Sequence, residues 1–397
     1  MKERFPYRDA IAIGSDHYNT LWLVRALGMA GFEPTAIIVG ACKEKSFVGK
    51  SKYCKQCFVL KQKNELLPLL QGLQFSQKTV ILTSGDVYEE LLDQNFDLLS
   101  DNYYLCNVDQ KQNGVRYWMD KRNQLERARK CGLKVPFSKS FDLNAESNDF
   151  TDVIYPALIK PEVSAGSTKN AFRICHNEGE LREALNEVKY ICSKVVVQEK
   201  ISHEAEYLLY GVSLGEEVII PGGDYKLISC TDINNLGMHV YGYVTSQHPE
   251  QFKDIDCVKE FVKSIGYKGI FSVELMLTQN DYCFLEINFR NDGTSYLFTQ
   301  AGVNIPAIWA ASCYGYDLSV FPKEFIRDKT YGLNEVNYLK YGLKKEGFIK
   351  SIKNVRRTKA FSLCMKGDMK PSLYKVIYNP KIVKLTDNVI VIGGGAS

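Results

Sequence analysis

The chain has 397 residues, of which 45% are hydrophobic and 24% charged. This balance is typical of a folded protein and excludes a disordered chain, and the length suits two or three packed domains. No apolar run approaches the roughly 18 residues that predict a membrane span. The first residues lack the apolar core of a signal peptide, because the first apolar stretch covers only residues 11–13. We therefore expect a cytoplasmic protein.

The distribution of cysteines also indicates a cytoplasmic protein. Twelve cysteines are mostly scattered singly along the chain, which is typical of reduced thiols in a cytosolic enzyme. Cys54 and Cys57 have the spacing of half a zinc ribbon, but neither a second such pair nor a spaced histidine pair completes the site. We expect these two thiols to have no metal role.

The net charge of +4 is unevenly distributed. Residues 340–384 contain thirteen Lys and Arg against two acidic residues, so the rest of the chain carries a net charge of −7. A nucleic-acid-binding protein would be basic overall, so we expect no nucleic-acid partner. Within residues 344–363, basic and apolar residues alternate at near-helical spacing. This pattern predicts either a peripheral contact with an anionic membrane or a helix that covers the core and exposes ordinary lysines.

Strands and helices alternate in the first hundred residues. Strand-like apolar runs cover residues 10–13, 36–39 and 79–82. The first run leads into Gly14-Ser15-Asp16 and a helix that ends at Gly31, and the third leads into Ser84-Gly85-Asp86 and another helix. This repetition predicts a small parallel α/β domain. The first turn has one glycine where a dinucleotide-binding turn has three, so we expect a structural or substrate-side domain.

From about residue 113 the pattern changes to α+β. A helix is predicted from Asp120 to Gly132, and a capping box at Asn177 and Glu180 predicts another helix with apolar positions as far as Ile191. The predicted strands cover 154–159, 171–175 and 195–197. Hairpins are predicted through Gly215-Glu216 and across residues 271–290.

The hairpin at residues 271–290 is the segment richest in candidate chemistry. Its apolar runs flank a polar loop, which we place at residues 279–281. Strand side chains alternate between faces. One face is therefore predicted to carry Glu286, Asn288 and Arg290, and the other Leu285, Ile287 and Phe289.

The same register places Glu274 directly opposite Glu286. Two facing carboxylates repel each other unless a cation lies between them. Together with the amide of Asn288 they form a ligand set that suits Mg²⁺, with Mn²⁺ as a second choice, held partly by substrate phosphates. Arg290, two residues further along, would then stabilise charge on a transferring phosphoryl group.

This segment resembles the metal-binding end of the ATP-grasp superfamily, an acidic residue followed about a dozen residues later by E-x-N-x-R. Further landmarks over residues 110–315 follow in the order of that family. Lys121 resembles its first lysine, Lys160 its phosphate-binding lysine, and residues 164–168 its phosphate loop, although this loop has one glycine where many relatives have several. Residues 196–201 resemble the adenine hinge, and Glu206 the ribose-binding acid. No P-loop motif is present.

The resemblance implies a fold of class α/β plus α+β. It comprises a Rossmann-like pre-ATP-grasp domain over 1–112, an ATP-grasp domain over 113–315 and a basic C-terminal region over 316–397. It implies ATP and Mg²⁺ as cofactors, with Arg290 and Lys160 as catalytic residues. The implied nucleotide-binding residues are Lys121, Lys160, Ser164, Gly166, Ser167, Glu199, Lys200, Ile201 and Glu206. The implied metal ligands are Glu274, Glu286 and Asn288.

Weaker candidates lie outside these motifs. Lys226 is a candidate for contact with an acyl phosphate, while no pattern marks any histidine as a general base. Asp16 and His17 follow the first strand, where ligands reach an α/β domain. They are candidates for a substrate site, against the alternative of a helix cap and a surface imidazole.

In layout the chain resembles the D-aspartate ligase and carbamoyl-phosphate-synthase-like branch of the superfamily. This implies a carboxylate–amine ligase that forms an acyl phosphate, with an amino acid as one substrate. It also suggests a place in cell-wall or polysaccharide biosynthesis, contact with lipid-linked glycans at the inner face of the membrane, and compatibility with a homodimer. Two alternatives stay open: an enzyme that uses bicarbonate for carboxylation or carbamoyl phosphate formation, and a non-catalytic ATP-binding module.

Overall fold

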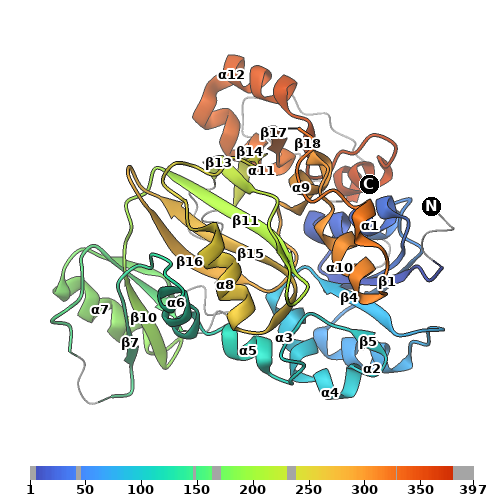
Figure 1. Cartoon of the computed structure of the whole chain (residues 1–397). Helices are drawn as coiled ribbons and strands as arrows, with labels where there is room; N and C mark the ends of the chain where they lie inside the picture. Colours follow the sequence, from blue (N-terminus) through green and yellow to red (C-terminus); the bar gives the residue numbers. More distant parts are fainter. Residues whose placement is uncertain are drawn as a thin grey trace, which may run out of the picture.

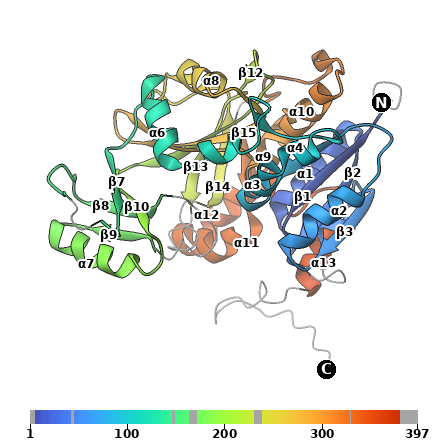
Figure 2. The ribbon, with the colours of Figure 1, turned by 90° about the horizontal axis from the view of Figure 1, so that it is seen from below.

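The computed structural model describes residues 6–41, 46–145, 149–162, 171–229, 238–327 and 329–378. Their strands form three sheets. A large central sheet lies between the N-terminal sheet on one side and a small antiparallel sheet on the other (Figure 1). The view from below shows the same order, with the small sheet at one end and the N-terminal sheet at the other (Figure 2). The predicted class, α/β followed by α+β, is confirmed.

The N-terminal sheet is parallel, as predicted, with strand order β3-β2-β1-β4-β5. Its strands are β1 (Asp9–Gly14), β2 (Glu33–Val39), β3 (Gln56–Leu60), β4 (Thr79–Thr83) and β5 (Tyr103–Tyr104). The helices are α1 (Tyr18–Ala30), α2 (Leu66–Gly72), α3 (Asp86–Gln94) and α4 (Phe96–Leu99). Gly31 ends α1 with φ 102°, a conformation that favours glycine. The carboxyl ends of β1 and β4 meet at one edge, which brings the segments after Gly14 and Thr83 together.

The small sheet is antiparallel, in the order β7-β10-β8-β9. It contains β7 (Ser138–Asp142), β8 (Ala157–Pro161), β9 (Arg173–Cys175) and β10 (Lys194–Glu199), and α7 (Glu178–Val188) packs against it. Asn177 caps α7 by accepting the amide of Glu180, but the Glu180 carboxylate returns to the amide of His176. Ile191 lies beyond this helix, and β8 starts three residues later than predicted.

The central sheet follows the path β16-β15-β11-β13-β14-β17-β18, with β12 and β6 at its margins. Its strands are β6 (Asn107–Val108), β11 (Ala205–Ser213), β12 (Val218–Ile219), β13 (Gly223–Ser229), β14 (His239–Thr245), β15 (Tyr267–Leu277), β16 (Tyr282–Asn288), β17 (Thr330–Leu333) and β18 (Ala360–Phe361). The associated helices are α5 (Gly114–Trp118), α6 (Lys121–Lys130), α8 (Ile255–Ser264), α9 (Ser295–Ala301) and α10 (Ile305–Cys313). Helices α6 and α8 cover one face: Gln124 bonds the backbone of Ile287, and Phe261 contacts the ring of Phe284. The opposite face of β11, β15 and β16 carries the polar residues of the candidate site.

The C-terminal residues join two of these bodies. Strands β17 and β18 extend the central sheet, followed along the chain by α13 (Lys370–Tyr378). Asp368 forms a buried ion pair with Arg25 of α1 at 2.9 Å, and it also accepts hydrogen bonds from Ser51 and Lys52. This cluster fastens the C-terminal part to the N-terminal domain.

Helix α12 (Leu343–Arg357) does not cover the core. Its one buried residue is Ser351, whereas Phe348 and Ile349 are 74% and 85% exposed. Of the two alternatives for this segment, the helix that covers the core is therefore wrong. Within the part of the chain that the structure describes, no helix has the length and apolar character needed to cross a membrane.

Candidate nucleotide and metal site

The central sheet gathers the predicted acidic residues on one face. Glu206 on β11 pairs with Lys226 on β13, and Glu274 on β15 pairs with Glu286 on β16. The register between β11 and β15 sets these two pairs in neighbouring rows of the same face. Asn288 follows two residues after Glu286 and so projects from that face too.

The predicted pairing of Glu274 with Glu286 is confirmed, although the predicted loop is one residue too short. The turn spans residues 278–281, and the register shifts by one residue at Leu285. This β-bulge compensates for the longer turn and restores the alignment of the two carboxylates. Because of the bulge, the predicted placement of Leu285 on the apolar face is wrong. Phe284, and not Leu285, belongs to the buried core.

The two facing carboxylates have different electrostatic environments. Burial and the neighbouring charge of Glu286 raise the pKa of Glu274 to about 7. For Glu286, burial acts in the same direction, but the ammonium group of Lys121 outweighs it and lowers the pKa to about 2. The Asn288 amide donates to Glu274 at 3.4 Å. Glu286 is thus ionised at neutral pH, whereas Glu274 is partly protonated there, as expected for like charges held together.

The two predicted phosphate-binding lysines approach this pair from separate elements. Lys121 is the first residue of α6, after the N-cap Asp120, and it forms an ion pair with Glu286. Lys160 lies on β8 of the small sheet and donates to Gln198 at 2.6 Å. Burial and the positive charge of Lys121 lower the pKa of Lys160 to about 8. Two ammonium groups in a desolvated site destabilise each other, which favours the binding of a polyanion between them.

The predicted adenine hinge connects β10 to β11. The Glu199 amide donates to the carbonyl of Phe137, and the Lys200 amide donates to the carbonyl of Pro156. The amide of Ile201 has no acceptor among the described residues. This part of the hinge therefore offers a donor, which is the group that a ring nitrogen of adenine requires.

Glu206, the predicted ribose-binding acid, is held by a lysine. Its carboxylate accepts from Lys226 at 3.0 Å, and His203 lies within 4.0 Å of it. Burial would raise the pKa of Glu206, but Lys226 lowers it overall. The charge of Lys226 also acts on Glu274, so this lysine belongs to the same site.

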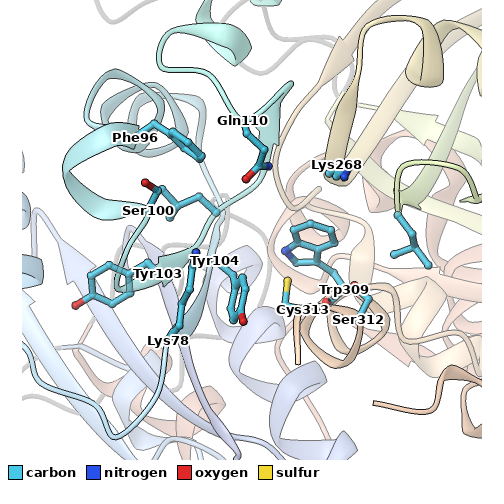
Figure 3. A pocket seen from close by; sticks show the side chains of 12 residues that line it. Lys78, Phe96, Ser100, Tyr103, Tyr104, Gln110, Lys268, Trp309, Ser312 and Cys313 are labelled. Atoms are coloured by element: carbon cyan, nitrogen blue, oxygen red, sulfur yellow. Dashed lines mark hydrogen bonds between the residues drawn. The ribbon is translucent and has the colours of Figure 1, made fainter. Parts of the chain in front are cut away.

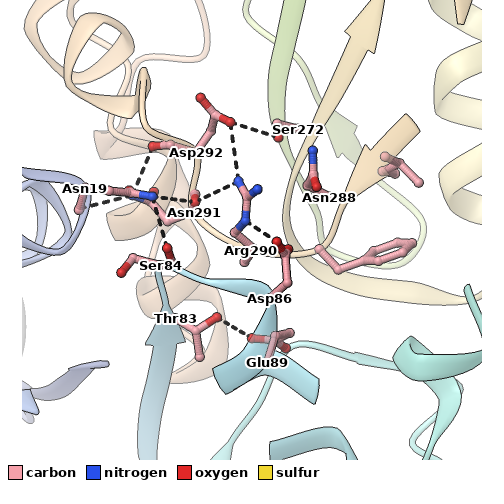
Figure 4. A network of polar contacts seen from close by, with 12 residues as sticks. Asn19, Thr83, Ser84, Asp86, Glu89, Ser272, Asn288, Arg290, Asn291 and Asp292 are labelled. Carbon is pink, nitrogen blue, oxygen red and sulfur yellow. Dashed lines mark hydrogen bonds and ion pairs between the residues drawn. The ribbon is translucent and has the colours of Figure 1, made fainter. Parts of the chain in front are cut away.

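Arg290 links the site to the N-terminal domain. Its Nε donates to Asp86 at 3.0 Å, and its Nη1 donates to Asp292 at 3.4 Å (Figure 4). Asp86 begins α3, directly after the turn that follows β4. Although burial opposes it, the two carboxylates raise the pKa of Arg290, which therefore remains charged. The guanidinium bridges two domains beside Asn288 and Glu274.

The part that Asn291 and Asp292 take in this network was not predicted. The buried side chain of Asn291 bonds Asn19 on α1 (Figure 4). It also accepts the hydroxyl of Tyr210 on β11, and the backbone amide of Asn291 donates to the carbonyl of Thr83. Asp292 accepts the amide and hydroxyl of Thr294. The turn after β4 was visible in the sequence as Ser84-Gly85-Asp86, but no local pattern indicated that it meets the end of β16.

Asp16 and His17 have structural roles. The Asp16 carboxylate accepts the hydroxyl of Ser46 and the amides of Phe47 and Val48. His17 caps α1 by accepting the amide of Asn19, and burial with the nearby Lys375 lowers its pKa to about 4. The helix-cap alternative therefore describes His17 better than a surface imidazole does.

The predicted phosphate loop, with Ser164, Gly166 and Ser167, lies outside the described residues. Over the described part of the chain, no three His, Cys, Asp or Glu side chains gather as a metal site. The candidate metal ligands are thus two carboxylates and an amide. This donor set fits Mg²⁺, and a cation would relieve the repulsion that raises the pKa of Glu274.

Comparison with known proteins identifies the central part of the chain. Residues 118–294 match the family model described as "ATP-grasp domain". A formate-dependent phosphoribosylglycinamide formyltransferase from Sulfurisphaera tokodaii is 31% identical over 166 residues. This match covers 39% of the chain and 40% of the relative, so the similarity spans well under half of either protein.

Solved structures with the same fold cover more of the chain. The L-amino acid ligase from Bacillus licheniformis has a TM-score of 0.57 and 15% identity, over 77% of this chain and 73% of that one. N5-carboxyaminoimidazole synthetase from Staphylococcus aureus, solved with ADP, has a TM-score of 0.61 and 16% identity, over 81% and 80%. Residues 118–294 are thus similar to an ATP-grasp domain, and the two solved structures share the fold of most of the chain.

Proposed function

We propose that the protein is an ATP-dependent carboxylate–amine ligase that activates its carboxylate as an acyl phosphate. The observation that carries this proposal is the convergence of Lys121, Lys160 and Arg290 on the facing pair Glu274 and Glu286. Three cations from three elements around two carboxylates suit a nucleotide polyphosphate with a divalent ion. The ATP-grasp match and the ADP complex of the staphylococcal neighbour support the choice of ATP.

In this proposal each group has one task. Ile201 and Glu199 hold adenine at the hinge, while Glu206 faces the ribose. Lys121 and Lys160 offset the negative charge of the phosphates, which requires the Lys121 ammonium to leave Glu286 when the nucleotide enters. Glu274, Glu286 and Asn288 would hold Mg²⁺, which when bound neutralises charge on the phosphates.

Arg290 would stabilise the charge that develops during transfer of the phosphoryl group. A carboxylate oxygen of the substrate attacks the γ-phosphorus of ATP, and the bond from that phosphorus to ADP breaks. The amine then attacks the acyl carbon, loses a proton and displaces phosphate. The guanidinium is half-buried and already fixed by Asp86 and Asp292, so it needs little reorganisation to meet the transferring group.

Two classes of carboxylate are candidates for the substrate. An amino acid is the first candidate, and the L-amino acid ligase neighbour supports it. A place in cell-wall or polysaccharide biosynthesis stays a prediction from the family resemblance. A one-carbon carboxylate is the second candidate. It is favoured by the relatives named formate-dependent formyltransferases and by the N5-carboxyaminoimidazole synthetase neighbours.

Peripheral membrane contact is proposed separately from catalysis. The exposed Phe348 and Ile349 on the basic helix α12 support it. Salt-sensitive binding of the full chain to anionic liposomes, lost in Ile349→Glu, is the expected result. No binding to anionic vesicles at low salt would contradict the contact.

The ligase proposal is tested by phosphate release from MgATP. Wild type, Glu286→Gln and the matched control Glu250→Gln, which changes an exposed carboxylate, are compared with D- and L-amino acids, formate and bicarbonate, each with amine acceptors. We expect turnover that requires one carboxylate, persists in Glu250→Gln and is lost in Glu286→Gln. ATP binding with no turnover across the panel and in cell extract would favour a non-catalytic module.

A further inference from the structure

A cavity of about 380 Å³ lies away from the candidate nucleotide site, where the N-terminal sheet meets helix α10 and the central sheet. Lys78 and Tyr104 border it from the N-terminal domain, and Trp309 and Cys313 border it from α10, with Lys268 of β15 at the rim (Figure 3). Lys78 immediately precedes β4, whereas the turn with Asp86 follows that strand. The cavity and the site with Arg290 therefore lie at opposite ends of β4, separated by roughly 17 Å of extended chain.

The charge of the cavity wall is positive. Two lysines border the cavity and no acidic residue does. Neither Lys78 nor Lys268 forms an ion pair within the described residues, and the Lys78 ammonium lies 4.8 Å from the centre of the Tyr104 ring. Lys268 also borders an adjoining cavity that contains Asp109 and Glu216. The Lys78 end is therefore the stronger site for an anion.

The rest of the wall is aromatic and apolar. Four aromatic residues border the cavity, among them Tyr104 and Trp309. Trp309 is 7% exposed, and its indole N–H has no acceptor within the described residues. Burial raises the pKa of the Cys313 thiol, which therefore stays neutral. Flat rings beside a cation are suited to a planar ligand with one negative end.

We propose that this cavity is a binding site for a small aromatic monocarboxylate. Its ring lies against Trp309 and Tyr104, and its carboxylate meets the ammonium of Lys78. Lys268 at the rim adds positive potential along the route of entry. The site is separate from the ATP site and does not depend on the proposed ligase activity.

The test is calorimetry of the full chain with naphthalene-2-carboxylate and its neutral analogue naphthalene-2-carboxamide. We expect the acid to bind about tenfold more tightly than the amide, since a charge-assisted contact with Lys78 is lost in the amide. Lys78→Gln should weaken the acid about tenfold without affecting the amide, while Lys61→Gln, a change at an exposed lysine, should affect neither. Saturating MgADP should leave the affinity of the acid unchanged.

A second variant guards against loss by misfolding. Leu214→Trp places a bulky ring at the border of the cavity and should abolish binding of both probes, with the unfolding temperature and MgADP affinity retained. Equal affinity for acid and amide, indifference to Lys78→Gln, displacement by MgADP, or no saturation by the acid up to about 5 mM would each overturn the proposal.

Discussion

Glu274 and Glu286 face each other across β15 and β16, yet Lys121 pairs with Glu286 and not with Glu274. This asymmetry separates the two pKa values, with Glu274 raised to about 7 and Glu286 lowered to about 2. Glu286 thus stays ionised, and its negative charge makes ionisation of Glu274 less favourable. The arrangement is unfavourable without a cation and becomes favourable when one binds.

Replacing Glu274 by Gln should stabilise the free protein and abolish turnover. The folded pKa of about 7 lies above the ordinary value of 4.5, so the folded state binds this proton more tightly than the unfolded state does. Protonated Glu274 therefore costs the folded state little at low pH. As the pH rises from 4.5 to 7, the buried carboxyl group ionises and the free energy of unfolding decreases, and this loss is complete above pH 7. We expect Glu274→Gln to raise the free energy of unfolding by about 1–3 kcal/mol at pH 8 and by much less at pH 5. Urea unfolding at both pH values measures this, and a destabilised variant at pH 8 would contradict the electrostatic account.

Removing either lysine should weaken nucleotide binding. Lys121→Met and Lys160→Met each delete a half-buried cation beside the candidate phosphate site, so the Kd for MgADP should rise about tenfold or more. Calorimetry with Lys61→Met as the control for an exposed lysine measures the effect. Wild-type affinity in both variants would show that the phosphates bind elsewhere.

Nucleotide affinity should fall in mildly alkaline solution. Because the pKa of Lys160 is lowered to about 8, its ammonium loses a proton as the pH rises through 8. We expect the Kd for MgADP to increase between about pH 7.5 and 9.5, approaching tenfold per pH unit at the upper end. Lys160→Arg stays charged in this range and should bind with little pH dependence. A similar pH profile for both proteins would assign the effect to another group.

Arg290 should affect the chemical step more than binding. Its guanidinium is held by Asp86 and Asp292, and the ligase proposal assigns it to the transferring phosphoryl group. Arg290→Gln is expected to lower kcat about 100-fold or more, with the Kd for MgADP within about threefold of wild type. Steady-state kinetics and calorimetry separate the two effects, and Arg129→Gln on the exposed side of α6 is the matched control. Weaker MgADP binding with an unchanged kcat would contradict this prediction, because it would mean that Arg290 binds the nucleotide and does not act in the chemical step.

The buried pair Arg25 and Asp368 should be a major contact between the C-terminal part and α1. Both side chains are almost fully buried, so Asp368→Ala leaves an unpaired buried guanidinium. We expect it to cost about 3–5 kcal/mol of unfolding free energy. The double variant Arg25→Met with Asp368→Leu should recover part of this loss, because it removes both charges. Urea unfolding of the three proteins tests the assignment, and a loss below about 1 kcal/mol in Asp368→Ala would contradict it.

Local sequence patterns predicted much of the fold. The strand-turn-helix repeat gave β1, β2 and β4 of the parallel sheet, and Gly31 correctly marked the end of α1. The alignment of Glu274 with Glu286 was also predicted, because the longer turn and the bulge at Leu285 cancel each other. Such compensation cannot be recognised from alternation alone.

Contacts between distant segments could not be predicted in this way. Lys121 and Glu286 are 165 residues apart, and Arg290 and Asp86 are 204 apart. Periodicity describes which face of an element is apolar, but it does not say which two elements meet. The same limit applies to α12, whose apolar pattern resembles a core-facing helix although Phe348 and Ile349 are exposed.

The measurement that tests the central claim most directly follows the oxygen atoms of the carboxylate. The protein is supplied with MgATP, an amine and the oxygen-18-labelled carboxylate that supports turnover, and the released phosphate is analysed by mass spectrometry. If an acyl phosphate forms, one labelled oxygen passes from the carboxylate to each phosphate, because the amine displaces phosphate by breaking the bond between carbon and that oxygen. Unlabelled phosphate formed at the rate of product would mean that phosphate leaves by another route, and would contradict the account.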